Sequence, residues 1–170
     1  MKAKKILLLA GGPSKERRVS LETGKAVFRA LKTLGYNIIK VDPKLSSINF
    51  LKYNCDLAFN ALHGQFGEDG IIQGILEKQK IPYTHSGVKS STIAMDKVKS
   101  KRKFIKIKIN TPKFKVIKKL QDLNNSISKK KFVLKPISEG SSVGVLIYNK
   151  FDQINKLLIK KYLKKNNQLL

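Results

Sequence analysis

The chain has 170 residues, 41% of them hydrophobic, which suffices for one good core or for one small domain plus part of another. Its formal charge of +25 suggests a nucleic-acid partner, but only four of the 36 basic residues are Arg, the side chain favoured for bidentate phosphate and guanine contacts. The lysines are spread over the whole length. We therefore expect solvated basic faces, polyanion binding only at low salt, and no specific nucleic-acid partner.

The number of cysteines and the lengths of the apolar runs indicate the cellular compartment of the protein. The single Cys55 reads as a buried core thiol, and one cysteine cannot form an internal disulfide, so a reducing compartment is expected. The apolar run at 6–10 is shorter than the ~7–15 residues of a secretory core. No stretch approaches the ~20 residues of a membrane span. These features predict a cytoplasmic protein with no membrane contact.

The first half of the chain alternates predicted strands and helices. Ser20 is expected to N-cap a helix that Gly35 stops. The apolar face of this helix is predicted to comprise Leu21, Ala26, Val27, Ala30, Leu31 and Leu34. The predicted strands are 5–10, 37–41, 57–62 and 81–84, with a short helix or turn at 46–53 and a helix ending near 79. This order predicts a Rossmann-like α/β domain with a parallel sheet over residues 1–90.

A second domain is expected over residues 91–170. Two short helices are predicted within 88–108, a strand at 113–117 and a polar helix or loop at 120–131. Strands at 132–136 and 143–148 should form a hairpin with a Gly/Ser-rich connection. An amphipathic helix is predicted over 151–162, and 168–170 begins another apolar element.

Residues 63–74 lie where a predicted strand turns into a helix. The stretch holds His63, the adjacent carboxylates Glu68 and Asp69, and four glycines. Ligands bind at the carboxyl ends of strands in open α/β sheets. His63 is either a capping or core histidine or a site residue, and its neighbours Gly64, Gly67 and Glu68 favour exposure at a site. Asp69 is expected to N-cap the following helix and to leave the helix N-terminus available to an anion or a polar substrate. His85 lacks such a setting and is interpreted as structural.

Three further features have alternative interpretations. Glu16, in the first strand-to-helix loop, is either a ligand contact or a surface glutamate paired with Arg17 or Arg18. Residues 137–142 could wrap a polyphosphate or form an ordinary polar hairpin, and they are not a Walker loop. Lys97 and Lys135 lie next to predicted element ends and are candidates only through their neighbouring motifs.

Four blocks in a fixed order carry a family resemblance. They are Leu9-Ala10-Gly11-Gly12-x-Ser14-x-Glu16-Arg17-x-Val19-Ser20, His63-Gly64-x-x-Gly67-Glu68-Asp69-Gly70-x-x-Gln73-Gly74, Met95-Asp96-Lys97 and Lys135-Pro136-x-x-Glu139-Gly140-Ser141-Ser142-Val143-Gly144. Together they resemble the D-alanine–D-alanine ligase family. The resemblance spans residues 4 to about 150.

The resemblance implies a fold and a reaction. The fold would be the Rossmann-like, pre-ATP-grasp sheet followed by the first, incomplete part of an ATP-grasp α+β domain. The enzyme would join two D-alanines for peptidoglycan synthesis. The first D-alanine carboxylate would attack the γ-phosphate of ATP, and the amine of the second would then attack the acylphosphate. The family also implies a homodimer.

The resemblance also assigns residue roles. Glu16 would bind the ammonium of the first D-alanine, Val19 would line that pocket, and His63 would lie beside the substrate. Glu16 and Ser141 would be catalytic, sharing the network that fixes the substrate. Nucleotide contacts would come from Lys97, Lys135, Glu139, Gly140, Ser141 and Ser142. Cationic clamps suit this chemistry because they offset charge on the transferring phosphoryl group.

The family's magnesium carboxylates are expected beyond residue 170. After residue 100 the acidic side chains are only Asp122, Glu139 and Asp152, whereas Mg²⁺ bound with ATP needs carboxylate oxygens. No metal ligand is therefore expected here, and the chain is interpreted as a truncated form that alone turns over poorly or not at all. The alternative is an inactive remnant or ligand-binding module of the same family.

Overall fold

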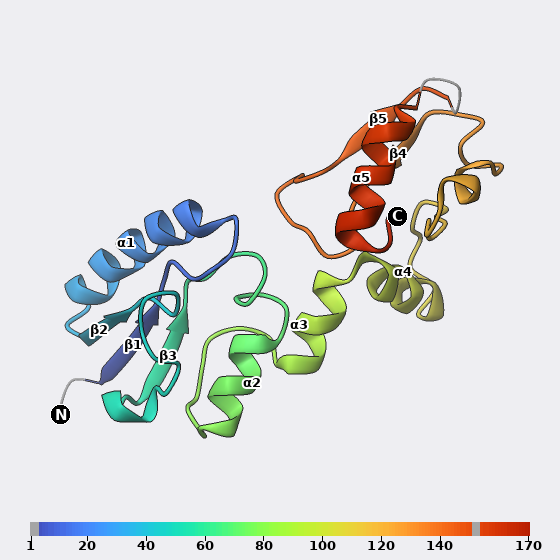
Figure 1. The fold of residues 1–170 in the computed structure, drawn as a ribbon. Coiled ribbons are helices and arrows are strands. Elements are labelled where there is room, and N and C mark those ends of the chain that lie inside the picture. Colours follow the sequence, from blue (N-terminus) through green and yellow to red (C-terminus); the bar gives the residue numbers. More distant parts are fainter. Residues whose placement is uncertain (1–3, 151–153) are drawn as a thin grey trace. The chain divides into compact units, whose positions relative to one another are not determined.

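A computed structural model describes residues 4–150 and 154–170 of the protein (Figure 1). The described chain forms two compact units that divide between Thr92 and Ile93. Helix α3, Val88–Met95, crosses this division. The expected domain limits, 1–90 and 91–170, stay a prediction, since a compact unit is not by itself shown to be a domain.

A parallel sheet forms the centre of the first unit. Its strands are β1 (Lys5–Leu9), β2 (Asn37–Val41) and β3 (Leu57–Asn60), in the order β2-β1-β3 with both pairs parallel. The predicted parallel sheet is confirmed. The predicted strand at 81–84 is wrong, because Tyr83 makes only an isolated bridge to Ala58. Pro82 has no N–H to donate, which limits how far a ladder can extend there.

Both faces of β1 are covered, which explains its uninterrupted apolar sequence. Leu7 and Leu9 lie in a buried cluster with Ile72 and Leu76 of helix α2 (Ile71–Lys78). On the other face, helix α1 (Arg17–Thr33) lies along the sheet (Figure 1). The central strand is therefore held from both sides, and its carboxyl end is fixed in position.

The predicted start of helix α1 is wrong, and its predicted end is confirmed. The helix begins at Arg17, and Ser20 lies inside it, completely buried, where its hydroxyl bonds other backbone groups. At the other end, Gly35 adopts a φ of +79° and donates its N–H to Lys32 O, while Tyr36 N donates to Leu31 O. This Schellman pattern places glycine where a left-handed residue is needed.

The face that α1 presents to the sheet also differs from the prediction. Its buried residues are Ser20 and Gly24, whereas Leu21 is 37% and Leu34 is 70% exposed. A Cβ on Gly24 would lie 2.4 Å from the Ala10 Cβ. Small residues thus allow a close helix–sheet approach that hydrophobicity alone does not indicate.

Short elements complete the first unit and lead out of it. The predicted helix or turn at 46–53 is a 3₁₀ turn, Leu51–Tyr53. The two short helices predicted within 88–108 are confirmed as α3 and α4, the latter spanning Lys97–Lys106.

The second unit contains a two-stranded antiparallel sheet and one further helix. Strands β4 (Phe132–Leu134) and β5 (Leu146–Tyr148) form the predicted hairpin, each shorter than expected. Helix α5 spans Lys156–Asn166 and Asn155 caps it, so it begins later than predicted; residues 151–153 of the predicted helix lie outside the described residues. The segment predicted as a polar helix or loop begins with a 3₁₀ helix, Leu120–Leu123, and continues as turns.

The core of this unit draws on segments far apart in sequence. Its buried side chains are Ile117, Leu123, Phe132, Leu134, Ile159 and Leu169. The strand predicted at 113–117 is wrong, because only Ile117 pairs, as an isolated bridge with Leu169. Leu170 exchanges backbone hydrogen bonds of 2.8 and 2.9 Å with Lys135. Within residues 4–150 and 154–170, no helix is both long and apolar enough to cross a membrane.

Candidate functional site

The loop after β1 is shaped by two glycines and an ion pair. Gly11 and Gly12 have φ values of +92° and +73°, and a Cβ on Gly11 would overlap the Asp42 carboxylate. Asp42 accepts from Gly12 N at 3.0 Å and binds Arg17 through both guanidinium nitrogens, at 2.9 and 2.5 Å. Sequence reasoning missed this pair, which replaces the considered pairing of Arg17 with Glu16.

Ionisation of Asp42 is favoured by its donors. Partial burial opposes the charged form, but hydrogen bonds from Arg17, Gly12 and Lys44 outweigh burial and hold the pKa of Asp42 below its ordinary value. The guanidinium of Arg17 also donates to Gly12 O at 3.0 Å. The Arg17–Asp42 ion pair and its hydrogen bonds to the Gly12 backbone together fix the loop that leads to Glu16.

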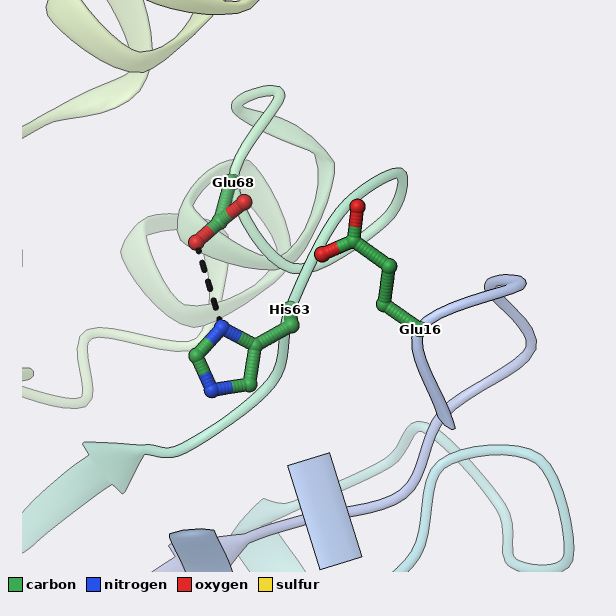
Figure 2. Close-up of side chains that lie close together, drawn as sticks. All are labelled: Glu16, His63 and Glu68. Atoms are coloured by element: carbon green, nitrogen blue, oxygen red, sulfur yellow. Dashed lines mark ion pairs between the residues drawn. The ribbon is translucent and has the colours of Figure 1, made fainter. Parts of the chain in front are cut away.

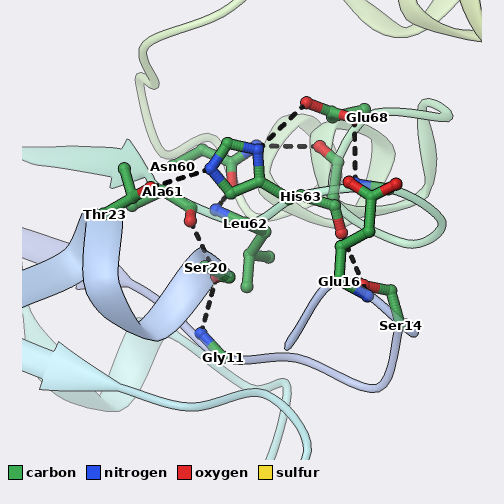
Figure 3. A network of polar contacts seen from close by, with 12 residues as sticks. Gly11, Ser14, Glu16, Ser20, Thr23, Asn60, Ala61, Leu62, His63 and Glu68 are labelled. Carbon is green, nitrogen blue, oxygen red and sulfur yellow. Dashed lines mark hydrogen bonds and ion pairs between the residues drawn. The ribbon is translucent and has the colours of Figure 1, made fainter. Parts of the chain in front are cut away.

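Two serines tie this first loop to the end of β3 (Figure 3). Ser20 Oγ donates to Ala61 O at 2.7 Å and accepts from Gly11 N at 2.8 Å. Ser14 Oγ donates to His63 O at 2.6 Å and accepts from Glu16 N at 3.1 Å. The two carboxyl-end loops are therefore held in one arrangement.

The loop at 63–70 is fixed by hydrogen bonds from two buried side-chain amides. Asn60 Nδ2 and Gln73 Nε2 each donate to Gly67 O at 2.9 Å. Within the loop, Glu68 Oε2 accepts a hydrogen bond from Gly64 N at 2.8 Å. The two amides come from β3 and α2, so rigid elements position the polar side chains of the loop.

The expectation for Asp69 needs correction. The N-cap of α2 is Gly70, with a φ of +98° and no side-chain cap. Asp69 instead accepts from Phe66 N at 2.8 Å and from Ile71 N at 3.0 Å. Its carboxylate thus occupies an N–H of the first turn, and the helix N-terminus is not left open for an anion as predicted.

Glu16, His63 and Glu68 converge on one place (Figure 2). Each offers one atom within 4.8 Å of the others, and all three side chains are partly buried. His63 Nδ1 lies 3.6 Å from Glu68 Oε1, and Nε2 shares a 2.9 Å hydrogen bond with Thr23 Oγ1. Two carboxylates beside an imidazole form a cluster suited to a cationic group such as an ammonium. The structure thus brings together two predicted residues, Glu16 and His63, with Glu68.

Other predicted residues of the first unit lie outside the cluster contacts. Val19 is 53% exposed on the first turn of α1. His85 is exposed, with a φ of +116°, and its ring bonds the Thr84 carbonyl. Cys55 is half-buried against the core cluster, and burial raises the pKa of its thiol.

In the second unit, Lys97 is anchored on backbone oxygens. It begins α4, where the Asp96 side chain caps the helix by accepting from Val98 N and Lys99 N. Lys97 Nζ donates to Ile137 O at 3.2 Å and to Glu139 O at 2.5 Å. Burial and the charge of Lys135 lower the pKa of Lys97, while Glu139 and Asp96 act against them.

The connection between β4 and β5 has an unusual backbone. Ser141 and Ser142 are exposed, with φ values of +45° and +59° that non-glycine residues rarely adopt. Val143 N donates to Gly140 O at 2.9 Å, which closes a turn. Lys97 of α4 donates to Glu139 O of the same connection, so its ammonium is held against the segment that carries the exposed serines.

Two carboxylates of the described second unit are already engaged and do not fit a magnesium site. Asp96 is used as a helix cap, and Asp122 accepts from Lys118 N and Lys119 N. Asp152 lies outside the described residues. Among the residues that the structure describes, three potential metal ligands come together in the first unit: Glu16, His63 and Glu68. Mg²⁺ prefers an all-oxygen shell, which these residues do not provide.

Comparisons with known proteins agree with this geometry. A family model described as D-ala D-ala ligase N-terminus matches residues 42–86. A D-alanine–D-alanine ligase of Pelagibacter ubique is 53% identical, over 98% of this chain and 56% of that protein. A ligase of the same name from Bacillus anthracis has a structure that covers 98% of this chain at 32% identity, with a TM-score of 0.84. The chain belongs to the D-alanine–D-alanine ligase family.

Coverage and fold place the chain within that family. It spans about half the length of the curated relatives it matches, 56% of the Pelagibacter ligase and 42% of one from Wolbachia of Brugia malayi. The expected fold class, a Rossmann-like parallel sheet followed by the first part of an ATP-grasp α+β domain, is confirmed by the solved ligases. A Bacillus anthracis ligase structure complexed with ATP has a TM-score of 0.82.

Proposed function

We propose that this chain supplies the first D-alanine site and part of the ATP site of a D-alanine–D-alanine ligase. The supporting observation is the convergence of Glu16 and His63 at the carboxyl end of a parallel sheet, on the motifs that define the family resemblance. The whole reaction would join two D-alanines, with ATP cleaved to ADP and phosphate, for peptidoglycan synthesis in the cytoplasm.

In this proposal the first unit holds the amino acid. The ammonium of the first D-alanine binds the Glu16 carboxylate, Val19 lines the pocket, and His63 lies beside the substrate with Thr23 and Glu68 fixing its ring. A carboxylate oxygen of the first D-alanine then attacks the γ-phosphorus of ATP. The bond from this phosphorus to the β,γ-bridging oxygen breaks, and ADP leaves. The amine of the second D-alanine attacks the acyl carbon, loses a proton and expels phosphate.

The second unit holds the polyphosphate. Lys97 and Lys135 offset its negative charge, and the segment Glu139, Gly140, Ser141 and Ser142 covers it. We also propose that Ser141 joins Glu16 in fixing the substrate. Mg²⁺, when bound in the family, would neutralise further phosphate charge; its ligands are proposed to lie outside these 170 residues.

Calorimetry tests the two binding sites separately. We expect the folded chain to bind D-alanine and ATP but not L-alanine. Glu16→Gln should weaken D-alanine binding by roughly tenfold and leave ATP binding unchanged, since it removes one charged partner of the ammonium. Lys135→Ala should show the reverse pattern. A folded sample that releases no heat with either ligand contradicts the proposal.

A second candidate is an inactive remnant or ligand-binding module of the same family, favoured by the engagement of Asp96 and Asp122 with backbone N–H groups. Both candidates predict that the 170 residues bind ligand without turnover; they differ in that only the first expects turnover from a longer protein that also supplies the magnesium carboxylates. We propose that the 170 residues alone do not turn over. D-alanine-dependent ADP release that Lys135→Ala abolishes would overturn that statement. A homodimer is proposed from the family, and sedimentation velocity tests it.

A further inference from the structure

Lys101 of α4, like Lys97, is held by neutral oxygen atoms. It lies one turn after Lys97, and the i and i+4 positions of a helix share a face. Its Nζ donates to Thr111 Oγ1 at 2.7 Å and to Pro112 O at 2.8 Å, and it lies 5.4 Å from the centre of the Phe114 ring. All three partners are neutral. The side chain is therefore fixed in place while its charge is left uncompensated.

The neighbouring lysine of the same helix provides a contrast. Lys99 pairs with Asp96 at 3.8 Å, whereas Lys101 makes no ion pair within residues 4–150 and 154–170. Burial first, and then the like charge of Lys135, lower the pKa of Lys101. Lys135 acts in the same direction on Lys97. Lys97 and Lys101 thus share one face of α4, and the charge of Lys135 acts on both.

Such an arrangement is unfavourable in the absence of an anion and favours binding one. Like charges in partly desolvated surroundings repel more strongly than in bulk water. A bound polyphosphate would attract each ammonium group and so offset the repulsion between them. Because Lys101 is anchored on neutral oxygens, its charge is not neutralised by a carboxylate and remains available to a bound anion.

We propose that Lys101 is a third cation of the polyphosphate site, acting beside Lys97 and Lys135 through its charge rather than by direct contact. The inference rests on the proposed ATP site. Lys101 would then be a positioning residue for the phosphate chain. Its contribution should grow with the number of negative charges on the ligand.

The test compares charge removal with loss of the anchor. Binding of ATP, inorganic tripolyphosphate and AMP to the 170-residue chain is measured at fixed ionic strength, well below the melting temperature. Lys101→Gln should weaken ATP and tripolyphosphate binding about fivefold, from the loss of one nearby unit charge, and should affect AMP less. Lys101→Arg should restore the affinity. Lys103→Gln, the same charge change at an exposed position of α4, should leave the affinity within about twofold.

A second variant separates charge from anchoring and serves if Lys101→Gln does not fold. Thr111→Val removes a neutral partner but keeps the charge, so polyphosphate affinity should be retained. The proposal is overturned if Lys101→Gln only lowers the melting temperature, or if Thr111→Val weakens binding more than Lys101→Gln does. If the unaltered chain binds neither ATP nor tripolyphosphate, the ATP site itself is wrong and this proposal falls with it.

Discussion

Arg17 and Asp42 join the start of α1 to the end of β2 by two parallel hydrogen bonds, at 2.9 and 2.5 Å. The pair also holds Gly12 by its N–H and its carbonyl oxygen. Glu16 lies on the loop between these anchors. The pair therefore contributes both to stability and to the position of the proposed ammonium ligand.

Replacing the carboxylate tests that dual contribution. Asp42→Asn keeps the shape but loses the charge, and we expect a loss of about 1–3 kcal/mol in the free energy of unfolding. Weaker D-alanine binding should accompany it. Urea titration and calorimetry measure the two effects. Glu22→Gln, which breaks the exposed pair with Lys25, is the matched control and should leave both unchanged. Equal effects of the two variants would contradict the assignment.

Acid should weaken the fold through the same carboxylate. The pKa of Asp42 lies below its ordinary value of 3.8 in the folded chain, so folding is favoured by its ionised form. This contribution is fully present above the ordinary carboxyl pKa and is lost as pH falls through the lowered one. The stability difference between the unaltered chain and Asp42→Asn should therefore be constant above about pH 5 and shrink below about pH 4. A difference that persists at the lowest pH where both fold would exclude the charge as its origin.

The Thr23 hydroxyl offers a test of how the imidazole is held. Thr23→Val preserves the side-chain shape but removes the 2.9 Å bond to His63 Nε2. We expect D-alanine affinity to fall by roughly threefold to tenfold, in line with the loss of one hydrogen bond, with little change in melting temperature. Thr33→Val removes a hydroxyl near the exposed end of the same helix and should change neither. An unchanged affinity in Thr23→Val would remove His63 from the proposed site.

Gly24 predicts a reversal of ordinary helix preference. Alanine normally favours a helix over glycine by about 1 kcal/mol. At position 24, however, the added Cβ would lie 2.4 Å from the Ala10 Cβ, so Gly24→Ala should destabilise by about 1–3 kcal/mol. At the exposed position 26, Ala26→Gly should destabilise by about 1 kcal/mol. Thermal melts of both variants make the comparison, and a stabilised Gly24→Ala would mean that α1 lies farther from β1.

Local signals explain what the sequence predicts well. The strand at 37–41 follows from its apolar content. The end of the preceding helix follows from the left-handed conformation at Gly35. Both signals involve only a few neighbouring residues. The β4–β5 hairpin follows from two apolar runs around a Gly/Ser connection. Motif order was sufficient for the family, because it does not depend on how the elements pack.

Tertiary pairing explains what the sequence does not predict. The sequence suggests Ser20 as a helix cap, but in the fold its hydroxyl donates to Ala61 O, a partner 41 residues away. Arg17 could pair with several acids, and only the fold selects Asp42. The predicted strands at 81–84 and 113–117 failed because strand formation needs a partner of matching length, and each finds one residue. The roles assigned to individual site residues remain predictions.

The Ser14 hydroxyl, in addition to Ser20, connects the two loops of the proposed site, because it donates to His63 O and accepts from Glu16 N. Neither loop can swing away without breaking a bond to the same oxygen atom. In native-state hydrogen exchange, the amides of the two loops should therefore open together with one common rate rather than independently. A ligand that binds either loop would slow exchange in both.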